Sequence, residues 1–130
     1  MKKLHKPNFF CWSQFNEDRN IDFHSYVWTS KERLVVVDPL PLTPHDRDHL
    51  QSLGQVTDIL ITNSDHIRDT SALASATGAQ VWGPAGERER FAIACDHWLK
   101  EGDTPFPGWE EYALEGSKTP GELAFLVEGD

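Results

Sequence analysis

A chain of 130 residues is long enough for one hydrophobic core but not for two. A single domain over residues 1–130 is therefore expected. With 21 acidic and 12 basic residues the formal net charge is −9, which speaks against a nucleic-acid partner. The longest apolar runs are far shorter than a membrane span, and the basic N-terminus is not followed by the apolar stretch of a secretory signal. Cys11 and Cys95 are interpreted as free thiols of a reducing compartment, so a cytoplasmic protein is expected. Since no apolar run could span a bilayer, no membrane partner is expected.

Two strands that form a hairpin are predicted first along the chain. Residues 23–28 are rich in aromatic side chains, and residues 34–37 are apolar throughout, as in a strand buried on both faces. A helix is expected to begin at Thr43, with Pro44 at its first position, and to end at Gly54.

The remaining predicted elements continue to alternate in type: a strand at 58–62, a helix from about His66 to Thr77, and strands at 80–82, 111–114 and 123–127. Such alternation predicts an α/β layered domain with a mixed sheet. The strands at 34–37 and 58–61 should be parallel neighbours, because a crossover helix joins them.

The segment Thr62-Asn63-Ser64-Asp65-His66 follows a predicted strand and opens a predicted helix. It resembles the His-x-His-x-Asp-His metal motif of the metallo-β-lactamase superfamily. Four further segments resemble family motifs in the family's order: Asp38 for the aspartate of "Asp-Thr-Gly", the helix-glycine-strand step at 72–82, the turn at 102–103, and residues 116–122 for "Gly-His-Thr-Pro-Gly-Ser".

The resemblance implies the N-terminal part of an αββα sandwich, with a mixed β-sheet inside and helices outside. Family members continue with further strands, so this domain is expected to be incomplete at its C-terminus. Residues 123–127 would then form an exposed sheet edge, through which the chain is expected to form a homo-oligomer.

In the family, histidines of these motifs hold zinc or another divalent metal, which activates water for hydrolysis. Here Asn63 stands at the first histidine's position, Ser64 follows without a second histidine, and Lys118 replaces the third. Only Asp65 and His66 match the motif, so they are the candidate catalytic and metal-binding residues. We expect no metal to be held tightly by this chain alone.

Two functions follow from this resemblance. The first is a metal-dependent hydrolase with a reduced site on Asp65 and His66, acting on a small-molecule substrate that the sequence does not identify. The second is a non-catalytic relative that keeps the scaffold to bind a ligand or partner.

Each candidate residue also has a structural alternative. Asp65 can cap the helix with His66 packing nearby, and Asp38 can be either a carboxylate that orients a site residue or a simple turn residue. Lys118 either replaces the lost cation, with its nitrogen within about 4 Å of the Asp65 or Asp38 carboxylate, or is a solvated loop lysine. His45 and His49 share one helix face, but a short polar helix without a third ligand favours a solvated surface.

Overall fold

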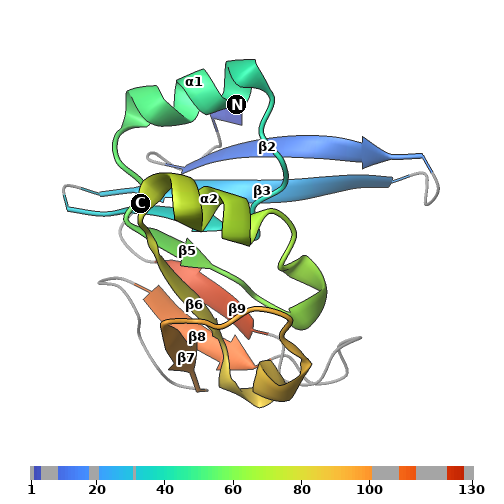
Figure 1. Cartoon of the computed structure of the whole chain (residues 1–130). Helices are drawn as coiled ribbons and strands as arrows, with labels where there is room; N and C mark the ends of the chain where they lie inside the picture. Colours follow the sequence, from blue (N-terminus) through green and yellow to red (C-terminus); the bar gives the residue numbers. More distant parts are fainter. Residues whose placement is uncertain are drawn as a thin grey trace.

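The fold is given by a computed structural model that describes residues 2–3, 9–17, 21–30, 32–100, 109–113 and 123–127. In these ranges a seven-stranded sheet has the order β1-β2-β3-β4-β5-β6-β7, and β8 pairs with β9 (Figure 1). The strands are β1 (Lys2–Lys3), β2 (Phe9–Asn16), β3 (Ile21–Thr29), β4 (Leu34–Val37), β5 (Asp58–Leu60), β6 (Gln80–Pro84), β7 (His97–Leu99), β8 (Trp109–Ala113) and β9 (Leu123–Val127). The helices are α1 (Pro44–Leu53) and α2 (Thr70–Thr77), with the 3-10 turns η1 (Ser64–His66) and η2 (Ala85–Arg90).

The sheet is mixed in strand direction. The pairs β1–β2, β2–β3 and β3–β4 are antiparallel, whereas β4, β5, β6 and β7 run parallel, with Val36 opposite Ile59. The predicted hairpin of β3 and β4, and the predicted parallel pair of β4 and β5 joined by α1, are therefore confirmed. The predicted α/β fold class is confirmed with them.

Alternating side chains of the central strands build two separate apolar layers. Val36, Ile59 and Val81 face the layer that also contains Leu50 of α1 and Leu73 of α2, so both helices cover one face (Figure 1). Val35 and Leu60 belong to the second layer on the opposite face. Because Val35, Val36, Ile59 and Leu60 are all fully buried, β4 and β5 form the buried centre of the sheet.

Helix α1 has the ends that its sequence predicts. The Thr43 hydroxyl accepts a hydrogen bond from the Asp46 N–H at 3.1 Å, and Pro44 needs no partner at the first position. Gly54 follows the last helical residue with a φ of 139°, a value that side chains with a Cβ rarely adopt. No helix among the described residues has the length and apolarity needed to cross a membrane.

The predicted start of the second helix at His66 is wrong. His66 ends the 3-10 turn η1, and α2 begins only at Thr70, because Arg68 adopts a left-handed φ of 49° that interrupts the helix. The N-cap residue of α2 is Asp69, so Asp65 does not occupy the capping position of this helix. The helix ends at Gly78, as the sequence predicts.

Three strands, β1, β2 and β7, had no counterpart in the sequence analysis. β2 pairs along its whole length with β3, and β7 extends the parallel part of the sheet beside β6. The predicted strand at 111–114 is observed one to two residues earlier as β8, and the predicted strand at 123–127 is observed as β9. β9 has β8 as a hydrogen-bonded neighbour, so one of its edges is paired.

A first testable prediction concerns Gly83 in β6. A Cβ at this buried position would lie 2.8 Å from the Cys95 Sγ and 3.1 Å from the Phe91 ring. We expect Gly83→Ala to lower the free energy of unfolding by about 1–3 kcal/mol, as overpacking does. In urea denaturation, adding Cys95→Ala should recover part of this loss, because it removes the nearest atom. Strictly additive effects of the two substitutions would contradict the proposed clash.

Candidate functional site

The candidate site lies where β4 and β5 end. Parallel strands bring their carboxyl ends to the same edge of a sheet, and ligand sites of α/β folds form there. Asp38 directly follows β4, and the segment Thr62–His66 leaves β5 after Ile61. The Asp38 N–H donates to the Leu60 carbonyl at 2.9 Å, which continues the pairing of the two strands into the site.

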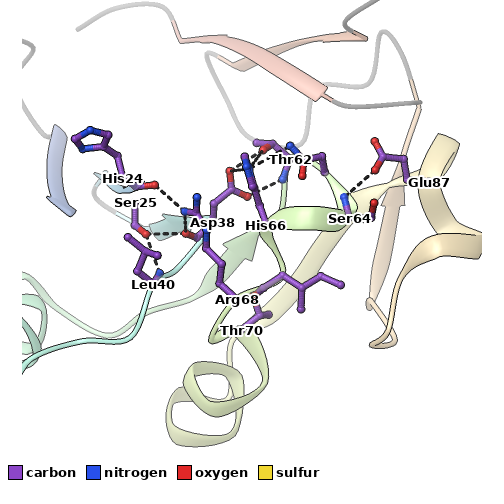
Figure 2. Close-up of polar contacts among 12 residues, drawn as sticks. His24, Ser25, Asp38, Leu40, Thr62, Ser64, His66, Arg68, Thr70 and Glu87 are labelled. Atoms are coloured by element: carbon purple, nitrogen blue, oxygen red, sulfur yellow. Dashed lines mark hydrogen bonds and ion pairs between the residues drawn. The ribbon is translucent and has the colours of Figure 1, made fainter. Parts of the chain in front are cut away.

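The Asp38 carboxylate joins the two strand ends (Figure 2). Its Oδ1 accepts a hydrogen bond from the Thr62 N–H at 2.8 Å, and its Oδ2 accepts one from the Thr62 hydroxyl at 2.6 Å. The His66 Nδ1 lies 3.1 Å from the same Oδ2. The structure thus brings together Asp38 and His66, two of the residues singled out in the sequence.

The His66 Nδ1 faces the Asp38 carboxylate and, at 3.2 Å, the Asn63 Nδ2, and these two neighbours suit different tautomers of the ring. A carboxylate only accepts hydrogen bonds, so the tautomer that satisfies Asp38 carries its proton on Nδ1 and donates it to that carboxylate. In the neutral ring, Nε2 then keeps its lone pair and is the nitrogen available to a proton or a metal ion. The His66 side chain is 33% exposed whereas the Asp38 side chain is 10% exposed, so the ring extends from a buried carboxylate toward solvent.

Asp38 adopts a strained backbone conformation. Its φ is 50°, in the left-handed region that costs a residue with a Cβ about 1–2 kcal/mol. Arg68, two residues after His66, has a φ of 49°, and these are the two non-glycine residues with positive φ among those described. Strained backbone conformations persist only where the surrounding contacts are strong enough to maintain them. They are found at functional sites more often than elsewhere.

The other side of the loop is held by a residue that the sequence analysis did not identify. Glu87 in η2 is only 1% exposed, and its Oε1 accepts a hydrogen bond from the Ser64 N–H at 2.7 Å (Figure 2). Its Oε2 is buried without a hydrogen-bond partner. Nothing in the local sequence distinguishes Glu87 from the other charged residues of 87–90. Glu87 is buried because η2 packs against β6.

Asn63, at the position of the family's first histidine, is buried at 4% exposure, with its Nδ2 3.2 Å from the His66 Nδ1. The backbone of Asp65 is part of η1. The Asp65 side chain and the whole of Lys118 are outside the part of the chain that the structure describes. The predicted pairing of Lys118 with Asp65 or Asp38 therefore remains a prediction.

Other nucleophile and metal candidates are structural. His45 is exposed, whereas His49 is half-buried and packs edge-on against Phe10, with 5.7 Å between the ring centroids. The fully buried Ser25 hydroxyl donates to the Asp38 carbonyl at 2.6 Å. Burial, with a smaller contribution from the charge of Asp96, raises the pKa of the Cys95 thiol to about 11, which keeps it protonated and unreactive at neutral pH.

The described side chains do not fit the family's three-imidazole zinc site. Among them, no three His, Cys, Asp or Glu side chains are grouped so that they could hold one ion. His66 has Thr62, Asn63 and the already hydrogen-bonded Asp38 as neighbours, and one imidazole nitrogen is too few for tetrahedral zinc. What the arrangement does supply is an imidazole base with a carboxylate behind it.

A family model described as "Metallo-beta-lactamase superfamily" matches residues 1–130. Among curated relatives, the hydroxyacylglutathione hydrolase of Rhodobacter capsulatus is 32% identical over 114 residues, which cover 83% of this chain and 44% of the relative. That of Jannaschia sp. (strain CCS1) is 45% identical over 78 residues, covering 54% of this chain and 28% of the relative. The chain thus spans less than half of the length of these two relatives.

Solved structures agree with the family match. ETHE1 from Myxococcus xanthus superposes with a TM-score of 0.68 at 23% identity, covering 91% of this chain and 53% of that protein. The DIM-1 metallo-β-lactamase superposes with a TM-score of 0.72 at 13% identity, covering 96% of this chain and 63% of that protein. These likenesses confirm the fold that the sequence motifs predicted.

A second testable prediction separates the two roles of the Glu87 carboxyl group. Glu87→Ala removes the acceptor of the Ser64 N–H and should lower the free energy of unfolding by about 1–3 kcal/mol. Glu87→Gln keeps an oxygen for that N–H and removes a buried acid with one unpartnered oxygen, so its unfolding free energy in urea should equal or exceed the native value. Equal losses in both variants would show that the hydrogen bond to Ser64 is not the main contribution.

Proposed function

This chain belongs to the metallo-β-lactamase superfamily, and we propose that it carries a hydrolytic site of reduced form in which His66 is the water-activating group. The observation that carries the proposal is the 3.1 Å contact between the His66 Nδ1 and the Asp38 Oδ2. A carboxylate in this position holds the ring in one tautomer and stabilises the imidazolium that forms when Nε2 takes a proton.

In the proposed reaction, Nε2 of His66 accepts a proton from a water molecule whose oxygen attacks an acyl carbon. The bond between the acyl carbon and the leaving group then breaks, and the leaving group takes the proton back from His66. The curated relatives are named hydroxyacylglutathione hydrolases. A small acylated molecule is therefore the proposed substrate class, and hydroxyacylglutathione is the first compound to test.

The proposed mechanism uses no step through a zinc ion, because the described donors do not fit the family's site. Of the motif residues, Asp65 and His66 remain a candidate pair for at most one weakly held zinc or other divalent ion. Two protein ligands leave a tetrahedral ion half-coordinated, which is why tight binding by this chain is not expected.

A non-catalytic role is the second candidate, and buried Asn63 favours it. At 4% exposure, this amide fills the first histidine's place with a group that neither ligates zinc well nor titrates near neutral pH. The scaffold would then bind a small ligand or a partner chain without turnover. Hydrolysis assays separate the two proposals directly.

A third testable prediction addresses catalysis. His66→Ala removes the base and should lower the rate of hydroxyacylglutathione hydrolysis by about 10²- to 10⁴-fold, the usual contribution of a general base. Asp38→Asn should also lower it, because the amide can donate to Nδ1 and stabilise the wrong tautomer. His45→Ala, which removes an exposed histidine on α1, should leave the rate unchanged. A native rate equal to the uncatalysed rate, or to that of His66→Ala, favours the non-catalytic role.

A fourth testable prediction addresses the metal. Isothermal titration of the chelator-treated chain with zinc at neutral pH should show no tight stoichiometric binding, because fewer than three protein ligands converge on His66 among the described residues. His66→Ala is the matched control. A sub-micromolar zinc site that this substitution abolishes would restore the metal-dependent mechanism.

A further inference from the structure

The carbonyl oxygen of Asp38 is as firmly held as its carboxylate. It accepts hydrogen bonds from the Ser25 hydroxyl at 2.6 Å and from the Arg68 NH1 at 2.8 Å. The same Ser25 oxygen accepts the Leu40 N–H at 2.8 Å, so it bridges both sides of the Asp38 turn. These contacts surround the residue whose left-handed φ of 50° requires outside support.

Arg68 comes from the loop that carries His66. Its NH1 group donates to the Asp38 carbonyl and, also at 2.8 Å, to the His24 carbonyl of β3 (Figure 2). Its guanidinium lies 5.5 Å from the centre of the Phe23 ring. Because Arg68 follows His66 by two residues, the loop contacts Asp38 twice. His66 touches the carboxylate, and Arg68 touches the carbonyl.

These contacts form a closed ring of interactions. The path runs from the Asp38 carboxylate through His66 and the chain to Arg68, and from its NH1 back to the Asp38 carbonyl. Burial lowers the pKa of Arg68, and the charge of Asp38 opposes this change, so the guanidinium remains a cation at neutral pH. A charged donor makes stronger hydrogen bonds to carbonyls than a neutral one.

From this geometry we propose that Arg68 is a positioning residue, which holds the strained Asp38 turn so that the carboxylate meets His66 and Thr62. The inference deepens the proposed function and rests on it, since it assigns how the Asp38–His66 couple is kept in place. Without the two NH1 bonds, the turn would relax away from φ 50°, and the carboxylate would move with it.

The test uses Arg68→Met, Arg68→Lys and the matched control Arg33→Met. Methionine and lysine face the same backbone strain at φ 49° as arginine, so the variants differ in the donors, the charge and the contact with Phe23 but not in strain. Both hydrogen bonds come from the single NH1 nitrogen, so a lysine ammonium can partly replace them. Arg33 forms an ion pair with Asp58 at 3.1 Å. This pair lies at the amino ends of β4 and β5, whereas the candidate site lies at their carboxyl ends.

The first readout is hydrogen exchange of the Thr62 amide, which donates to the Asp38 Oδ1. Arg68→Met should speed this exchange by about tenfold or more relative to Arg33→Met, after correction for each variant's global stability by urea unfolding. Arg68→Lys should recover part of the protection. Unchanged Thr62 exchange in Arg68→Met, or the same acceleration in Arg33→Met, would overturn the inference.

The second readout is the tautomer of His66, followed by ¹⁵N NMR of the ring. The native chain and Arg33→Met should show a protonated Nδ1, whereas Arg68→Met should shift the ring toward a protonated Nε2. These measurements need no turnover. Absence of hydrolysis with an intact response of Thr62 would refute the proposed function alone, and hydrolysis with an unresponsive Thr62 would refute the role of Arg68 alone.

Discussion

The site depends on one carboxylate placed where two parallel strands end. The Asp38 backbone N–H continues the strand pairing to Leu60, and its side chain then replaces the next backbone partner by accepting the Thr62 N–H. Main chain and side chain together extend the contact between β4 and β5 beyond the last ladder pair. The chain from β4 can turn away toward α1 while the exit of β5 remains hydrogen-bonded, and that exit carries His66.

Much of this frame could be predicted because it depends on local patterns. The apolar run 34–37, the capped helix after Thr43 and the run at 58–61 fix the parallel pair through simple periodicity and chain-reversal rules. The proximity of Asp38 to the loop 62–66 follows from the same rule, because the carboxyl ends of parallel strands meet. What the sequence left open was whether Asp38 orients a site residue or only makes a turn, and its contacts with Thr62 and His66 favour the former.

The features that could not be predicted all depend on contacts between distant parts of the chain. Helix propensity gave no sign that Arg68 would adopt a positive φ, because that conformation is supported by carbonyls of residues 24 and 38. Glu87 looks like any charged residue in a polar segment until η2 packs it beneath Ser64. Ser25 likewise has no motif around it, and its role comes from facing the Asp38 turn from β3.

A purely structural turn at position 38 would have a simpler solution. Glycine adopts a φ near 50° without strain, whereas aspartate pays about 1–2 kcal/mol there. Both carboxylate oxygens of the aspartate contact Thr62, and one of them also contacts His66. Leu60 and Ile61, which precede Thr62 in the chain, are fully buried. The strain and the rigid support at Asp38 agree with the proposed role of this carboxylate in orienting the His66 imidazole.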